Sequence, residues 1–357
     1  MINVTKTYIP SLDKYSVYLK KIFSDGIITN NGQFLRKLKK ELENYLGVKN
    51  ILLVQNGTLA LQIAYKLLEL KGNVITTPFT FVATVSSQVW EGLTPKFVDI
   101  NSETLNLDER LIEKNISHSV SAIVPVHVFG NACEVEYIDK VAKKHGIKVI
   151  YDAAHAFGIK YKNKSILNYG DISIMSFHAT KIFHTIEGGA LVIKDDELYK
   201  KACLMINFGI DGLNSINNLG INAKMNELEA AMGLCILDSI DEIIDNRKNV
   251  YEYYMNHLKG NIVFQKHNES SSFNYSYFPI ILSNEEKVVK LVKALSSENI
   301  NPRRYFYPSL STLPYLINKS NVPIADDIAK RVLCLPFYDS IKVEELKTIV
   351  DIVNKNV

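Results

Sequence analysis

One lysine, Lys181, lies in a sequence setting that could make its amine reactive. The apolar run 172–177 and the short segment 178–180 come before it, and Gly188-Gly189 with the apolar run 190–193 follows. A lysine in a loop between two buried strands is poorly solvated, and burial lowers the pKa of an ammonium group. Such a lysine can form a Schiff base, because only the neutral amine attacks an aldehyde. An ordinary solvated loop lysine is the alternative, so the interpretation depends on other residues.

An acidic residue, Asp152, directly follows the apolar segment 149–151 and precedes Ala153-Ala154. At the end of a buried strand, a carboxylate needs a partner that compensates for its desolvation. A helix cap or a salt bridge would supply one. The competing hypothesis is that Asp152 keeps the ring nitrogen of pyridoxal phosphate protonated.

A third motif, Gln55-Asn56-Gly57-Thr58, lies between the apolar run 51–54 and a helix that the pattern predicts from Leu59. Free backbone N–H groups and the helix dipole make such an N-terminus a possible anion site. An ordinary N-cap by Thr58 is the alternative.

The elements that must position these residues alternate along the chain. The apolar pattern predicts strands at 51–54, 74–77, 95–98, 122–128, 148–151, 172–177 and 190–193, with helices at 34–46, 59–68, 82–90, 135–145 and 228–237. This alternation is typical of an α/β fold with a mostly parallel sheet, which binds ligands outside the carboxyl ends of its strands. Five possible ligand contacts fall at those ends: Thr58, Phe81, His127, Asp152 and Ser176.

Composition narrows the classes of function. The net charge of +3 over 357 residues gives no basic patch for nucleic acid or a membrane surface. The four cysteines are scattered without metal-type spacing, which favours core thiols and no metal site. There is no N-terminal signal pattern and no apolar run of about 18–20 residues, so we expect a cytoplasmic protein. We expect a large domain at 1–240, which includes helices within 13–47, and a smaller α+β domain at 241–357.

Taken together, the motifs resemble the DegT/DnrJ/EryC1/StrS family of sugar aminotransferases. The resemblance extends over essentially the whole chain and rests on an ordered set of segments: 55–58, 77–84, 125–130, 152–155, 176–181, 187–189, 207–209, 220–222 and 333–336. It implies a pyridoxal-phosphate enzyme of fold type I, with a mostly parallel, mixed seven-stranded sheet between helices and a smaller C-terminal α+β domain.

The resemblance also implies roles for single residues. Lys181 would bind the cofactor aldehyde and move the substrate proton, and Asp152 would pair with the pyridinium nitrogen. Phe81 would stack on the ring, and His155, where many relatives have glutamine, would reach the ring oxygen. Three residues would hold the phosphate: Gly57, Thr58 and Ser176. For His127, His178 and His184 we favour structural roles.

In this family a neighbouring subunit completes the cofactor site through a Gly-x-Asn-x-Arg segment, so the resemblance implies a homodimer. Here the segment is 220–224, and it offers Asn222 and Lys224. Lysine keeps the positive charge but loses the two-pronged guanidinium. A second difference is Ile186, where many relatives have glycine, and isoleucine lacks glycine's freedom at positive φ.

The implied reaction takes an amino group from L-glutamate, through the pyridoxamine form of the cofactor, to a nucleotide-linked keto sugar. Lysine at position 181 favours transamination, since related dehydratases carry histidine there. Segments 222–227 and 303–308 are similar to enzymes that make dTDP-4-amino-4,6-dideoxyglucose, a sugar of O-antigen synthesis. Candidate substrate contacts are Arg303, Arg304, Tyr305 and Tyr307. Two alternatives stay open: a 3-aminotransferase for an isomeric 3-keto sugar, and a non-catalytic sensor or scaffold that keeps the cofactor.

Overall fold

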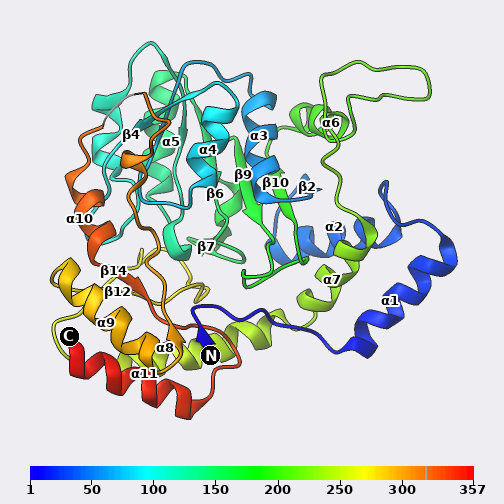
Figure 1. The fold of residues 1–357 in the computed structure, drawn as a ribbon. Helices are drawn as coiled ribbons and strands as arrows, with labels where there is room; N and C mark the ends of the chain where they lie inside the picture. The colour runs from blue at the N-terminus through cyan, green and yellow to red at the C-terminus, as the bar shows by residue number, and fades with distance from the viewer. Residues whose placement is uncertain (318–319) are drawn as a thin grey trace.

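The computed structural model describes residues 1–317 and 320–357, and a seven-stranded mixed sheet lies at its centre (Figure 1). In order across the sheet the strands are β2 (Ile51–Val54), β10 (Gly189–Ile193), β9 (Ile172–Ser176), β6 (Lys148–Asp152), β5 (Val120–Val124), β3 (Asn73–Thr76) and β4 (Thr94–Phe97). Strand β10 is antiparallel to both its neighbours, and the other pairings are parallel. This confirms the sheet that the resemblance implies.

Most of the strands are apolar runs because helices cover both faces of the sheet, and the edge strand β4 is only half buried. Alternate side chains point to opposite faces, so each face has its own core. One core joins Leu53 and Val192 to α2 (Gln33–Leu46), α5 (Val135–His145) and α7 (Glu227–Leu237). The other joins Leu52 and Leu191 to α3 (Gly57–Leu67) and α6 (Asp196–Met205), and α4 (Ala83–Trp90) lies beside α3.

Two parts of this domain differ from the sequence prediction. Strand β5 ends at Val124, four residues before the predicted end, because the chain turns into a short 3-10 helix at 128–130. Helix α6 was not predicted: four of its ten residues are charged, and only Ala202 and Met205 are buried. A capping signal is present there: the Asp195 side chain accepts hydrogen bonds from the backbone N–H groups of Glu197 and Leu198.

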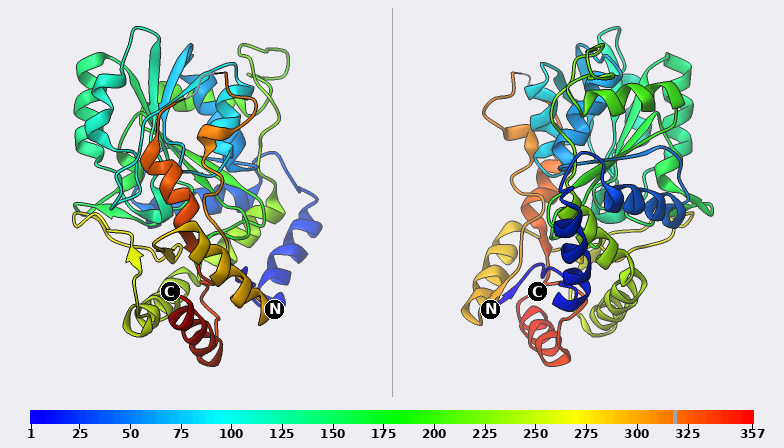
Figure 2. Two further views of the ribbon diagram at one scale, coloured as in Figure 1. Left: turned by 60° about the vertical axis from the view of Figure 1, so that its left-hand side comes forward. Right: turned by 90° about the vertical axis from the view of Figure 1, so that its right-hand side faces the viewer.

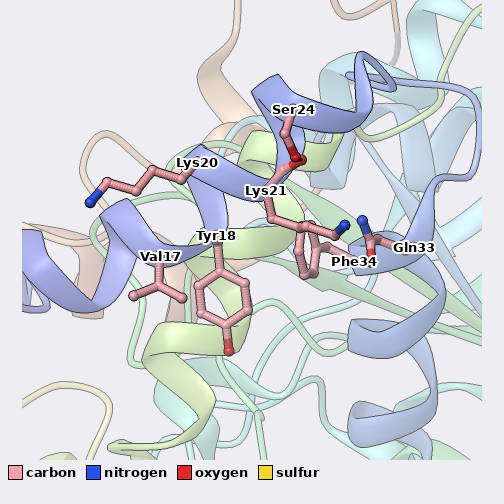
Figure 3. A pocket seen from close by; sticks show the side chains of 7 residues that line it. All are labelled: Val17, Tyr18, Lys20, Lys21, Ser24, Gln33 and Phe34. Carbon is pink, nitrogen blue, oxygen red and sulfur yellow. The ribbon is translucent and has the colours of Figure 1, made fainter.

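The N-terminal helix α1 (Leu12–Asp25) lies at the edge of the molecule and packs on α7 (Figures 1 and 2). The Tyr15 hydroxyl donates to the Leu228 carbonyl at 3.0 Å, and Lys14 forms an ion pair with Asp238 at 3.1 Å. Figure 3 shows an open groove on α1 and the start of α2, with the side chains of Val17 and Phe34 among its lining.

The second part of the chain continues from α8 (Ile240–His257), which carries the chain away from the large sheet (Figure 1). Its helices are α9 (Glu285–Ser297), α10 (Pro323–Arg331) and α11 (Val343–Asn356), and its three-stranded antiparallel sheet has the order β11 (Val263–Phe264), β12 (Pro279–Ile281), β14 (Val332–Cys334). A core of its own lies between α8, α9, α11 and this sheet, whereas the buried residues of α10 pack in a cluster shared with Phe79 and Phe97 of the large domain.

Smaller sheets complete the fold. Strand β1 (Ile2–Asn3) pairs in parallel with β13 (Ile300–Asn301), and β7 (Lys160–Tyr161) pairs with β8 (Lys164–Ser165). The first residues of the chain therefore join the C-terminal part, and the boundary at 240–241 stays a prediction. Over the ranges that the structure describes, no helix combines the length and the apolar character needed to cross a membrane.

Candidate active site

A cavity of about 390 Å³ lies at the carboxyl ends of the parallel strands, a volume typical of small-molecule sites. Residues that follow β2, β3, β6 and β9 line it, together with residues near 277 and 303–306 from the C-terminal part. The predicted site residues that it brings together are Gly57, Thr58, Phe81, Asp152, His155, Ser176, Lys181, Arg303 and Tyr305.

Lys181 stands in the loop between β9 and β10, as the sequence indicates. The loop is closed by backbone hydrogen bonds from Phe177 to Gly188 and from Thr185 to Phe177. The Lys181 amine donates to the hydroxyl oxygen of Tyr277 at 3.4 Å. Burial lowers the pKa of Lys181 to about 8, against the opposing charge of Asp152. About a fifth of the amine is therefore neutral at pH 7.4, far more than for a lysine of ordinary pKa.

Asp152 is the last residue of β6 and is buried. One carboxylate oxygen accepts the Thr84 hydroxyl at 2.8 Å, and the other accepts the Ala154 N–H at 3.1 Å. Burial raises the pKa of Asp152, while the two hydrogen bonds and the charge of Lys181 act in the opposite direction. A cationic N–H in the cavity would compensate this carboxylate for its desolvation.

The turn from β2 into α3 has the features of an anion site. The N-cap is Asn56, whose side chain accepts from the Leu59 N–H at 2.8 Å, so the alternative of a cap by Thr58 is wrong. Thr58 instead lines the cavity with Gly57. A Cβ on Gly57 would lie 3.1 Å from the Ser176 Cβ, and one on Gly189 would lie 2.5 Å from the Asn56 carbonyl carbon. Glycine thus keeps the helix N-terminus close to Ser176.

Two ring side chains that line the cavity, those of Phe81 and His155, differ in how exposed they are. Phe81 is 54% exposed, although it is a large apolar side chain that lines the cavity. His155 is buried, and its Nδ1 accepts the Phe129 N–H at 3.3 Å. Burial holds the pKa of His155 well below its usual value, so the ring is neutral and its proton is on Nε2. His155 can therefore donate one hydrogen bond from Nε2.

Four of the predicted site residues lie outside this cavity. Arg304 forms an ion pair with Glu285 at 2.7 Å, and its guanidinium carbon lies 3.4 Å from the centroid of the Tyr307 ring. These contacts occupy Arg304 and Tyr307 on the outer side of their loop, whereas Arg303 lines the cavity. The Lys224 amine donates to the side-chain oxygens of Asn207 at 2.7 Å and Asn222 at 2.9 Å, away from the cavity of its own chain.

The histidines for which we favoured structural roles fall into two groups. His127 is buried, its Nδ1 accepts the Cys133 N–H at 3.1 Å and it does not line the cavity, in agreement with the structural role favoured for it over a ligand contact. His184 accepts the Ile186 N–H at 3.2 Å and contacts the Tyr8 carbonyl at 2.8 Å. His178, in contrast, lines the cavity beside Glu187, with 3.6 Å between its Nε2 and the carboxylate.

Sequence reasoning missed two residues that contact the reactive groups. Thr84 belongs to the segment 77–84, and its place in the first turn of α4, one turn after Thr80, could have indicated that it faces Asp152. Tyr277 has no comparable signal, because it comes from the C-terminal part and meets Lys181 only through the tertiary fold.

Comparison with known proteins shows to which protein family this chain belongs. A model of the DegT/DnrJ/EryC1/StrS aminotransferase family matches residues 13–354. The chain belongs to this family. A dTDP-4-amino-4,6-dideoxy-D-glucose transaminase of Shigella dysenteriae is 42% identical over 99% of this chain and 98% of its own. A GDP-perosamine synthase of Vibrio cholerae is 31% identical, with 96% of each chain covered.

Two solved structures share the fold. DesI with its TDP-sugar product has a TM-score of 0.94 at 30% identity, over 99% of this chain and 92% of DesI. A 3-amino-5-hydroxybenzoic acid synthase has a TM-score of 0.91 at 22% identity, over 100% of this chain and 99% of its own. The chain is an aminotransferase, and the cofactor of the family is pyridoxal 5′-phosphate.

The residues present fit this cofactor. The cavity combines an amine of lowered pKa, a buried carboxylate and a helix N-terminus that glycines keep open, which suit an aldehyde, a pyridinium and a phosphate respectively. Among the described residues, no group of three or more histidine, cysteine or acidic side chains is arranged to hold a metal ion.

Proposed function

We propose that this aminotransferase moves the amino group of L-glutamate to dTDP-4-keto-6-deoxy-D-glucose and so makes dTDP-4-amino-4,6-dideoxy-D-glucose. The observation that carries the proposal is one cavity in which a lysine of lowered pKa and a buried aspartate meet an arginine, in a chain 42% identical to a transaminase of that name. The TDP-sugar product bound to DesI, a relative at 30% identity, supports a thymidine nucleotide.

Each protein group has a role that follows from its chemistry. When bound, pyridoxal phosphate supplies an aldehyde and an electron-withdrawing ring that stabilises negative charge beside the transferred amine. Asp152 would keep the ring nitrogen protonated, and the neutral Lys181 amine would take and return the substrate proton at Nζ. His155 would donate from Nε2 to the ring oxygen, and Phe81 would cover the ring face. The α3 N-terminus with Thr58 and Ser176 would hold the phosphate.

The residues of the C-terminal part that line the cavity would recognise the substrates. The guanidinium of Arg303 is held over the Tyr305 ring, 5.2 Å from its centroid, and both line the cavity. Arginine binds carboxylate and phosphate oxygens through two N–H groups at once, which suits glutamate and a nucleotide pyrophosphate. Tyr305 would pack on the sugar or the base.

We further propose that the enzyme works as a homodimer whose subunits share their sites. Asn222 and Lys224 would serve the cavity of the neighbouring copy, since they lie outside their own. They follow a loop that projects from the large domain (Figure 1) and exposes apolar side chains at Leu213, Ile216 and Leu219. We place the enzyme in the cytoplasm, in the synthesis of O-antigen or another surface glycan.

The product decides the substrate proposal. The purified enzyme, loaded with pyridoxal phosphate, should change its visible absorbance when glutamate is added, and then form an amino sugar from the 4-keto substrate. An amine at C4 in the NMR spectrum of the product is expected. The isomeric 3-keto sugar is offered in a separate reaction, and its conversion to a product with an amine at C3, with no turnover of the 4-keto sugar, would establish the 3-aminotransferase instead. A bound chromophore whose spectrum does not change with any amino donor would favour a sensor or scaffold.

Complementation tests the shared site. Lys181→Ala and Lys224→Ala each lose activity if both residues act in one site. If Lys224 acts across the dimer, subunits exchanged between the two variants regain up to about a quarter of the activity, because half of the dimers then hold one complete site. No recovery, with exchange verified by tagged subunits, would place Lys224 in its own chain's site or in none.

A further inference from the structure

Tyr277 is the C-terminal residue that contacts the reacting lysine. Its hydroxyl oxygen lies 3.4 Å from the Lys181 amine, and the amine lies 5.8 Å from the centroid of its ring. Burial raises the pKa of Tyr277 well above its ordinary value, so the hydroxyl keeps its proton. A neutral hydroxyl can accept a hydrogen bond from the ammonium form of lysine and donate one to the amine form.

The ring of Tyr277 is fixed on several sides by other rings. Its centroid lies 4.9 Å from that of His155, 5.6 Å from that of Phe129 and 5.7 Å from that of Tyr305. Aromatic pairs at these distances pack favourably, and only 7% of Tyr277 is exposed. The hydroxyl is therefore held in one place beside Lys181.

The backbone on the N-terminal side of Tyr277 is anchored by a buried arginine. Arg247, on α8, donates from one guanidinium nitrogen to the carbonyls of Tyr275 at 3.2 Å, Ser276 at 3.3 Å and Phe337 at 3.3 Å. The Ser276 hydroxyl in turn donates to the His155 carbonyl at 2.7 Å. These bonds tie the Tyr277 segment both to the C-terminal part and to the loop after β6.

Besides the cavity of about 390 Å³, which Lys181 and Tyr277 both line, the pair borders a second space that is too small for bulk water. A cavity of about 10 Å³ is lined by Lys181, Tyr277, Ser276 and Thr180 among others. This is at the lower limit for a single water molecule. On this side of the lysine, the Tyr277 hydroxyl is thus a proton-exchanging group supplied by the protein itself.

We propose that Tyr277 is a catalytic residue that partners Lys181 in proton transfer. Its hydroxyl accepts a hydrogen bond from the charged amine and donates one to the neutral amine, so that Nζ keeps one orientation while it gains and loses the substrate proton. The proposal rests on the role proposed for Lys181 as the base, and it adds a second group to that step.

The test starts with the protein free of cofactor, so that it does not depend on the sugar. Acetic anhydride labels neutral amines, and mass spectrometry of the Lys181 peptide gives the labelling midpoint between about pH 6 and about pH 11. Tyr277→Phe removes a hydrogen bond from both forms of the amine, but the bond made by the charged form is the stronger one, so the midpoint should fall by about half a pH unit or more. Tyr254→Phe is the matched control, because its buried hydroxyl donates to the Pro336 carbonyl in the core of the C-terminal part and Tyr254 does not line the cavity.

The loaded enzyme gives the second readout. With glutamate alone, Tyr277→Phe should slow the spectral change about 10- to 100-fold, a range typical of the loss of an acid–base partner, with KM within a few-fold of wild type. Tyr254→Phe should keep the wild-type rate and midpoint even where its melting temperature falls. A Tyr277→Phe protein with wild-type midpoint and rate would overturn the proposal. A wild-type enzyme that reacts with glutamate but refuses the 4-keto sugar would defeat only the substrate proposal.

Discussion

The Thr84 hydroxyl donates a hydrogen bond to the Asp152 carboxylate at 2.8 Å, so a residue in the first turn of α4 fixes the carboxylate at the end of β6. The Thr84 hydroxyl also contacts that of Thr80 at 3.0 Å, which keeps it aimed at the carboxylate. Because burial alone raises the pKa of Asp152, each hydrogen bond that lowers it matters for the charge of this group.

We therefore expect Thr84→Val to weaken cofactor binding. Valine has the shape of threonine but no donor, so the pKa of Asp152 should rise further and its pairing with a pyridinium should weaken. A hydrogen bond to a charged group is worth about 1.5–3 kcal/mol, so the Kd of pyridoxal phosphate should rise about 10- to 100-fold in a fluorescence titration. Thr76→Val is the control, since the buried Thr76 hydroxyl donates to the Val124 carbonyl and not to Asp152. Equal losses in the two variants would contradict this role.

The low pKa of Lys181 has a consequence for stability. Below pH 8 the amine is charged in the folded and the unfolded chain, but the folded state holds the proton less favourably, so this charge destabilises the fold. Lys181→Met should therefore raise the free energy of unfolding of the cofactor-free protein at pH 7, by at most about 3 kcal/mol.

The sign of the pH dependence follows from the same pKa. Between about pH 8 and the ordinary lysine pKa of 10.5, the unfolded chain binds more protons at this site than the folded chain, so the wild-type protein becomes more stable as the pH rises. The advantage of Lys181→Met should then shrink toward pH 10.5, as urea denaturation at several pH values will measure. Lys164→Met, at an exposed lysine of β8, should show no such trend. A gap that stays constant with pH would show that the charge of Lys181 is not its cause.

Much of the fold and the floor of the site could be predicted from the sequence. Most strands of the large sheet are buried on both faces, and their sequences are conspicuous because few polar residues interrupt the apolar runs. Since the carboxyl ends of parallel strands meet at one edge, Thr58, Asp152 and Ser176 could be expected together before any contact was known.

The contribution of the C-terminal part to the site could not be predicted in the same way. Tyr277 reaches Lys181 only because α8 and the strands after it fold back onto the large domain, and no local pattern contains that information. Arg303 and Arg304 are neighbours with the same side chain, and their directions depend on a partner, Glu285, that is distant in sequence. The choice of Asn56 over Thr58 as N-cap shifts the helix start by two residues, within the usual uncertainty of helix ends.

The two neighbouring arginines should respond differently to the same substitution. Arg303→Lys keeps the charge in the cavity but loses the two-pronged contact, so KM for glutamate or for the nucleotide sugar should rise about 10-fold or more. Arg304→Lys loses stacking on Tyr307 and weakens the ion pair with Glu285, so it should lower stability by about 1 kcal/mol and leave KM nearly unchanged. Initial rates and thermal melts of both variants separate the two roles. A larger rise of KM in Arg304→Lys would reverse the assignment.

The turn that follows Lys181 carries a strained residue. Ile186 has φ of 73°, in the left-handed region that glycine adopts at little cost and a β-branched residue does not. Its N–H donates to His184 at 3.2 Å, and the neighbouring Thr185 hydroxyl donates to the Glu187 carbonyl at 2.6 Å. These bonds hold the turn in the conformation in which the family commonly places glycine.

Ile186→Gly should therefore stabilise the protein, although glycine usually destabilises folded chains. Removing the left-handed strain should raise the free energy of unfolding by about 1–2 kcal/mol. The extra freedom of glycine in the unfolded chain should lower it by about 0.5–1 kcal/mol. Ile186 is 45% exposed, so little buried apolar surface is lost. Ile186→Val keeps the branched Cβ and should leave the melting temperature close to wild type. If Ile186→Gly melts below both proteins, the isoleucine side chain contributes more through packing than its backbone conformation costs.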